Sequence, residues 1–237
     1  GDGTKPPVPA LLSPLNMSSR VSPFAYCGPT QAVYFGKAAS DGTNTNLFLL
    51  WNSFGPFQTG VEYSVVSKDG QGTKTAGATA KLTSKGILGG NFSTGARLTT
   101  ATTSDGKSST NIDAGASLSQ FANMPVSVAA SFGPSQNSQS ICIGGESWVA
   151  TGIRKEAKTG NAFSGGFDYQ AKYSAAISQR FYASYEYSVS DSKKTFVAGS
   201  RLFVPFGNLE LNYERVMPVG SMQPQNNISF RVGYYIE

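Results

Sequence analysis

The sequence predicts an all-β protein: an antiparallel transmembrane β-barrel of about a dozen or more strands, preceded by a proline-rich N-terminal extension. Three observations lead to this prediction. Apolar and polar residues alternate with a period of two along segments of about ten residues, short turn sequences separate these segments, and charged residues within them fall in the polar phase. A period of two places the two sets on opposite faces of a strand, and about 9–11 residues suffice for a tilted strand to cross a bilayer.

The alternation is clearest from Phe163 to the C-terminus. The segment that begins at Phe163 and runs to Ile177 sets Phe167 and Tyr169 against Asp168. The final segment repeats the pattern. Its apolar phase is Ile228, Phe230, Val232, Tyr234 and Ile236, and its other phase is Ser229, Arg231 and Gly233. Each segment therefore has one apolar and one polar face.

The same reading extends back to Gln31. The predicted strands are Gln31–Ala38, Asn46–Phe54, Phe57–Ser67, Thr73–Thr83, Leu88–Thr102, Ser109–Phe121, Pro125–Phe132, Ser140–Arg154, Ala162–Ser178, Gln179–Ser190, Thr195–Val204, Asn208–Val216 and Asn227–Ile236. Turn sequences lie between many of them: Ser40-Asp41-Gly42, Lys68-Asp69-Gly70, Ser104-Asp105-Gly106, Lys158-Thr159-Gly160 and Asp191-Ser192-Lys193. Asp-Gly pairs adopt the positive φ angles of tight hairpins, so we expect antiparallel neighbours joined by short loops.

The charged residues of the predicted strands share the polar face. An Arg or Lys in the hydrocarbon near the bilayer midplane costs about 2–4 kcal/mol, so a lipid-facing wall sorts such residues inward. The expected lumen residues are Glu62, Lys81, Arg97, Asp113, Asp168, Lys172, Glu186, Arg201, Glu210, Glu214 and Arg231. In a narrow lumen they pair and fill the barrel, and in a wide one they line a water-filled pore. About a dozen strands exceed what side chains alone fill, which favours the pore.

The composition supports a membrane barrel. Hydrophobic residues make up 39% of the chain and charged residues only 14%, whereas about a quarter of a soluble domain is charged. The sequence holds no run of 18 apolar residues, so a transmembrane helix is excluded. The outward faces of the last third are rich in Tyr and Phe, as membrane interfaces require. A soluble or extracellular structural or adhesive β protein also alternates and is the alternative of a different class.

Residues 1–30 differ from the rest and form the expected N-terminal extension, with the barrel domain over residues 31–237. They contain Pro6, Pro7, Pro9, Pro14, Pro23 and Pro29 around an apolar stretch that includes Val8, Leu11, Leu12 and Leu15. Proline prevents a long helix or a paired strand here. The extension is expected either to lie in the barrel as a plug, to bind a partner protein, or to be a loose tether.

Several functions are disfavoured. The chain contains no histidine, which excludes histidine-dependent triads and histidine metal sites, and we expect no enzyme activity and no cofactor. The net charge of +5 is scattered without a basic block, so no nucleic-acid partner is expected. Gly144-Gly145-Glu146-Ser147-Trp148 lacks the spacing of a nucleophile elbow and is interpreted as strand. Cys27 and Cys142 are either paired or free.

One segment resembles a known family. Ser140-Ile141-Cys142-Ile143-Gly144-Gly145-Glu146, followed by the charged turn Arg154–Gly160 and the strand Ala162–Tyr173, resembles a strand of the mitochondrial porin superfamily, which includes the voltage-dependent anion channel and the outer-membrane translocase channel. The resemblance covers Ser140–Glu237 and implies an outer-membrane location, mitochondrial ahead of bacterial. The chain shows fewer strands than that superfamily and lacks its Gly-Leu-Lys signature and amphipathic N-terminal helix, so no residue role is transferred.

The expected function is an outer-membrane pore for ions or small polar solutes, or the barrel subunit of an outer-membrane assembly. The expected partner is membrane lipid, with a homo-oligomer or subunits of a membrane complex as open alternatives. A net positive lumen favours anions, although the mild net charge is also consistent with no electrostatic role.

Overall fold

A computed structural model describes residues 31–119, 126–134, 136–144, 147–220 and 223–235. In this part of the chain the structure has fourteen strands. They are β1 (Gln31–Ala39), β2 (Asn44–Phe54), β3 (Phe57–Lys68), β4 (Gln71–Ile87), β5 (Gly90–Thr103), β6 (Ser108–Ser119), β7 (Val126–Phe132), β8 (Gln136–Gly144), β9 (Trp148–Ala157), β10 (Gly160–Lys172), β11 (Ser178–Ser188), β12 (Lys194–Val204), β13 (Gly207–Met217) and β14 (Gln225–Tyr235). The predicted N-terminal extension lies outside the described residues.

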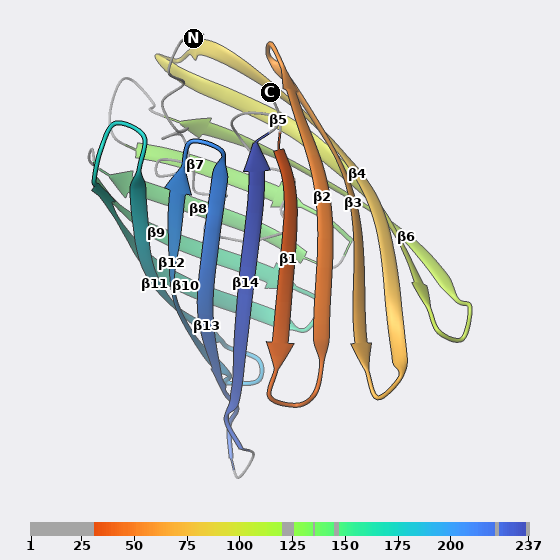
Figure 1. The fold of residues 1–237 in the computed structure, drawn as a ribbon. Coiled ribbons are helices and arrows are strands. Elements are labelled where there is room, and N and C mark those ends of the chain that lie inside the picture. Colours follow the sequence, from red (N-terminus) through yellow and green to blue (C-terminus); the bar gives the residue numbers. More distant parts are fainter. Residues whose placement is uncertain (1–30, 120–125, 135, 145–146, 221–222, 236–237) are drawn as a thin grey trace.

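The strands form one closed antiparallel barrel. Each strand pairs with its sequence neighbours, and β1 closes the sheet against β14, from Gln31 opposite Tyr235 to Ala39 opposite Asn227. Figure 1 shows this seam at the front, where β14 ends and β1 begins at the same upper end of the barrel. Because the strand number is even, the closing pair is antiparallel like all the others. The predicted fold class is confirmed.

The prediction was wrong at one strand and too long at another. The expected strand Ser140–Arg154 is two strands, because β8 ends at Gly144 and β9 begins at Trp148. The outward-facing residues change across this break from odd positions, such as Ile143, to even positions, such as Trp148, which one continuous strand does not allow. The other long segment also ends early. β10 stops at Lys172, and the Ser174 hydroxyl accepts the N–H of Ile177 in the turn that follows.

The turns follow the predicted chemistry. Asp69 and Gly70, the two residues between β3 and β4, have φ angles of 52° and 78°, the left-handed pair that an Asp-Gly hairpin allows. The Asp41 carboxylate accepts the N–H of Thr43 at 3.0 Å in the β1–β2 turn. This bond favours the ionised form and lowers the pKa of the Asp41 carboxyl. Asp105 and Asp191 accept the N–H two residues on in the same way.

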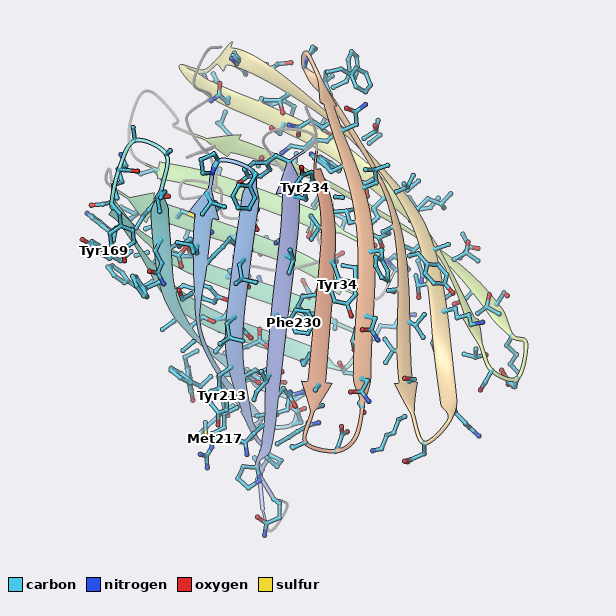
Figure 2. All side chains as sticks on the ribbon, viewed as in Figure 1. Tyr34, Tyr169, Tyr213, Met217, Phe230 and Tyr234 are labelled. Atoms are coloured by element: carbon cyan, nitrogen blue, oxygen red, sulfur yellow. The ribbon has the colours of Figure 1, made fainter. Side chains whose placement is uncertain are left out.

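The outer face carries an apolar band. Leu211, Ile228 and Val61 expose 57–62% of their surface, and aromatic side chains lie beside them. Figure 2 shows Tyr234 near the upper end of the barrel and Tyr213 with Met217 near the lower end, while Tyr34 and Phe230 meet between them with ring centroids 5.5 Å apart. A soluble sandwich would expose polar residues here. An exposed apolar band of this extent is that of a protein that spans a membrane.

The two ends of the barrel differ in chemistry. Figure 1 shows the β4–β5 and β12–β13 turns at the upper end of the barrel. These turns contain the apolar residues Leu88 and Phe206, each exposed by about two thirds. The turns at the lower end present charged residues, among them Asp69, Asp105 and Lys107. We call them the apolar end and the charged end. Since charged groups avoid hydrocarbon, the charged end projects into water and the apolar end lies at the membrane surface. Among the described residues, no helix has the length and hydropathy to cross a bilayer.

Close packing of β13 on β14 depends on a glycine. A Cβ at Gly207 would overlap the carbonyl oxygen of Gly233 on the neighbouring strand. We therefore expect Gly207→Ala to lower the free energy of unfolding by about 1–3 kcal/mol, as overpacked sites do. Gly165→Ala is the matched control, because a Cβ there has its nearest neighbour 3.9 Å away. Urea unfolding in detergent compares the two variants, and equal midpoints would contradict the expectation.

Candidate pore lining

The eleven predicted lumen residues all fall in the inward phase of their strands. Glu62, Lys81, Asp168, Glu210 and Arg231 are buried, whereas Arg97, Asp113, Glu186, Arg201 and Glu214 are partly exposed. Lys172 is the last residue of β10 and is exposed at the rim of the apolar end. The mid-strand charges therefore lie on the inner wall, and Lys172 lies at its edge.

Most inner charges form ion pairs between nearby strands. Arg97 Nε on β5 donates to Glu62 Oε1 on β3 at 3.0 Å, and Arg201 Nε on β12 donates to Glu210 Oε2 on β13 at 2.6 Å. Lysines make two further pairs: Lys155 with Glu186 at 2.5 Å, and Lys37 with Glu214 at 2.6 Å. Pairing at neighbouring wall positions leaves each charge compensated on its own side of the barrel.

Four charged side chains lie at one level across β11–β14. The register places Arg180 opposite Arg201, Arg201 opposite Glu210, and Glu210 opposite Arg231. We call Arg180, Arg201, Glu210 and Arg231 the charged row. Like charges directly opposite each other destabilise a sheet, so Arg180 and Arg201 require nearby acids. Arg201 has Glu210, and Arg180 forms an ion pair with Asp168 of β10.

Hydrogen bonds hold the charged row in place. The Tyr182 hydroxyl donates to Glu210 Oε1 at 2.7 Å, and Asn212 Nδ2 donates to the Tyr182 oxygen at 3.0 Å. The Ser229 hydroxyl in turn donates to Asn212 Oδ1 at 2.9 Å. Arg180 and Asp168 have side chains only 6% and 1% exposed, so their pair lies away from water. The inner wall of β10–β14 is thus a connected polar network, which fixes its charges in space.

Sequence reasoning missed three inner cations: Arg180, Lys37 and Lys155. The signal for Arg180 was present, because it shares the polar phase of Ser184 and Glu186 along β11. The partner of Asp168 could not be predicted, since the pairing depends on the register between β10 and β11. Lys37 and Lys155 were missed because each lies near the end of its strand, where alternation is short.

The expectation of a polar inner face is wrong for β1 and β2. Apart from Lys37 and other polar residues toward the strand ends, their inward residues are apolar and 0–7% exposed: Val33, Phe35, Leu47, Leu49 and Trp51. We call this group the apolar lumen patch. The misreading arose because both phases of residues 47–51 are apolar, so no charge marks the inner face. Cys142, on the inner face of β8, is free and buried, with its sulfur 3.3 Å from the Thr151 hydroxyl. Cys27 lies outside the described residues.

The wall opens into a cavity at the charged end. A space of about 1080 Å³ lies between the β3–β4 and β5–β6 turns, lined by Lys68, Asp69, Asp105, Lys107 and neighbouring Thr and Ser residues. Among the described residues, no group of three or more Asp, Glu or Cys is placed to hold a metal ion. The cavity offers charges of both signs to a polar solute.

A closed antiparallel barrel with an apolar outer band and a charged inner wall defines a transmembrane β-barrel. The fold is similar to the outer-membrane protein Omp33 of Acinetobacter baumannii, with a TM-score of 0.61 and 11% identity over 88% of this chain and 98% of that one. It is also similar to a bacterial polysaccharide outer membrane secretin, with a TM-score of 0.58 and 8% identity over 88% of this chain and 99% of that one. No protein-family model matches the sequence, and the search of curated proteins found no relative.

The comparisons support an outer-membrane barrel, and they do not support the expected preference for a mitochondrial location. The fourteen strands of the described barrel differ from the 19 of the mitochondrial voltage-dependent anion channel. The quoted strand of the resemblance is itself broken, because β8 ends at Gly144.

Proposed function

We propose that this protein forms a pore for ions or small polar solutes in a bacterial outer membrane. The charged row carries the proposal, because fixed charges on the inner wall of a membrane-spanning barrel are what a polar path requires and a dry ligand cavity excludes. The lining consists of the eleven inward or rim charges predicted from the sequence, together with Arg180, Lys37 and Lys155. The charged end, which projects into water, is the mouth.

Lys37 and Glu214 offer a matched test of a conducting path. They form one ion pair on the inner wall and are 31% and 24% exposed, so either is reached by a solute. We expect Lys37→Gln to make the pore more cation-selective and Glu214→Gln to make it more anion-selective. Each permeability ratio should change by about two- to threefold, since one charge changes the local potential by about one kT. Lys194→Gln is the control, because Lys194 lies in the outward phase of Phe196.

Planar bilayers with a salt gradient provide the measurement. Stepwise currents and opposite shifts of the reversal potential in the two variants, with none in the control, support a pore lined by these residues. Identical reversal potentials in all variants would contradict the lining. The pore itself would be contradicted by a lack of current from the full chain over a range of voltages.

A further inference from the structure

One part of the barrel sheet has a neighbouring strand on only one side. β6 pairs with β5 along its whole length, but with β7 only as far as Ala114, which lies opposite Phe132. Continued past this pair, the register would place Pro134 opposite Ile112, and proline has no N–H for the ladder. Among the described residues, Ser108–Asp113 therefore has no strand beside it on the side of β7, and we call this segment the free edge. Figure 1 shows the β5–β6 hairpin projecting at the lower right of the barrel.

The hydrogen-bond pattern of the β5–β6 hairpin fixes which backbone groups reach the free edge. The Thr103 N–H donates to the Lys107 carbonyl at 2.9 Å, so every second pair from this one onward is a hydrogen-bonded pair. Thr100 and Thr110 form one of the intervening pairs, and their hydroxyls lie 3.1 Å apart because side chains of such pairs approach more closely. Three residues of the free edge therefore point their N–H and C=O groups away from β5: Ser108, Thr110 and Ile112.

The free edge lies in water and is not protected against another strand. Open edges do not occur in hydrocarbon, where their backbone groups would stay unsatisfied. The turn beside the free edge belongs to the charged end, with Asp105 and Lys107 54% and 85% exposed, and the outward hydroxyls of Thr102 and Ser108 meet at 3.0 Å next to it. Sheets commonly protect an exposed edge with a proline, a charged side chain or a bulge. From Ser108 to Ile112 the free edge has none of these.

The membrane decides between a second copy of this chain and a different one. Antiparallel pairing of two identical edges needs a two-fold axis perpendicular to the sheet. In a barrel this axis lies in the membrane plane, so it would insert the two copies in opposite directions. Parallel pairing needs an axis along the strand, whereas barrel strands are tilted by about 35–45° from the membrane normal. Copies inserted in the same direction therefore do not pair at the free edge, and the strand that fits it comes from another polypeptide.

We propose that the free edge binds an extended segment of a partner protein, which joins the barrel sheet as an added strand. A segment about 20 Å long, or about six residues, covers Ser108–Asp113. On the outer side the segment lies beside Ile112, which is 64% exposed, so a β-branched or other apolar residue fits there. On the inner side it lies beside Ser109 and Asn111, which favours polar residues. This site depends on the fold and not on the pore.

Amide hydrogen exchange measures the free edge directly. In the full chain in detergent micelles, NMR should show exchange about tenfold or more faster for the amides of Ser108, Thr110 and Ile112 than for the alternate residues, which bond to β5. The probe for the partner is a terminally blocked peptide with the sequence of residues 97–102, which already pairs with this segment on the side of β5. Excess peptide should slow the exchange of the three amides by about fivefold or more, because protection follows the bound fraction.

Two variants at Thr110 separate backbone pairing from binding to side chains. Thr110→Pro removes the central N–H of the free edge and leaves the hydrogen bonds to β5, since proline is tolerated where a strand N–H faces solvent. This variant should lose the effect of the peptide. Thr110→Val is the matched control, because it keeps both the N–H and the branched shape, and it should bind the peptide as the unaltered chain does. An equal heat-modifiable gel shift shows that both barrels are folded.

N-methylated peptides identify strand addition by its period of two. One copy is methylated at positions 98, 100 and 102 and the other at positions 99 and 101, so the two present their remaining N–H groups to opposite sides. One copy should bind and the other should not. Equal binding of both copies, loss of binding in Thr110→Val, or unchanged exchange with excess peptide would overturn the proposal. So would slow exchange along the whole free edge without peptide, which would mean that a monomeric barrel covers the edge with its own chain or that a dimer covers it with a second copy.

Discussion

Replacement of Arg180 by Leu is expected to lower the free energy of unfolding by about 3–5 kcal/mol. The substitution leaves Asp168 as a charge that is 1% exposed and has lost its ion-pair partner. Removing one member of a buried pair carries the whole cost of desolvating the other. The effect is expected to be among the largest of any inner-wall substitution, because the pair lies deepest in the network of β10–β14.

A double-mutant cycle separates the pair from its neighbours. Asp168→Leu/Arg180→Leu should unfold at a denaturant concentration nearer to the wild type than either single variant, since the double variant buries no charge. Lys107→Leu is the exposed control, because Lys107 and Asp105 are 85% and 54% exposed and pairs of that kind contribute about 0–1 kcal/mol. Urea titration of barrels in lipid vesicles gives the four values. Additive losses in the cycle would show that the two residues do not form an energetic pair.

A second large effect is expected on the outer face. Leu211 points outward from β13, is 62% exposed, and lies between Ser200 and Phe230 on the neighbouring strands. Leu211→Arg places a cation in the middle of the apolar band and should lower the free energy of unfolding in vesicles by about 2–4 kcal/mol. The same substitution should cost much less in a soluble fold, where an exposed position faces water.

The control is an exposed apolar residue outside the apolar band, in the turn after β13. Val219 is also an exposed apolar residue, but it belongs to the charged end, outside the band. Val219→Arg should therefore change the free energy of unfolding by about 0–1 kcal/mol. Equal losses for Leu211→Arg and Val219→Arg would mean that the band does not contact lipid, and the membrane assignment would fail with it.

Much of the fold could be predicted because alternation is a local property. A strand such as β14 shows its two faces in its own residues, from Ile228 to Tyr234, and Asp-Gly turns show where β3 gives way to β4. The prediction failed where the local signal was absent or misleading. Residues 47–51 are apolar on both faces, and the break between Gly144 and Trp148 was masked by small residues that continue the strand pattern.

The sequence by itself determined that these segments are strands and which residues share a face, because both follow from a period of two. It also determined that mid-strand charges avoid the lipid side, because a charge in hydrocarbon is costly. Only the tertiary structure decided that fourteen strands close into a barrel, that Arg180 meets both Arg201 and Asp168, and that apolar residues of β1 and β2 gather inside it. Those outcomes depend on register, where a shift of one residue exchanges the two faces of a strand.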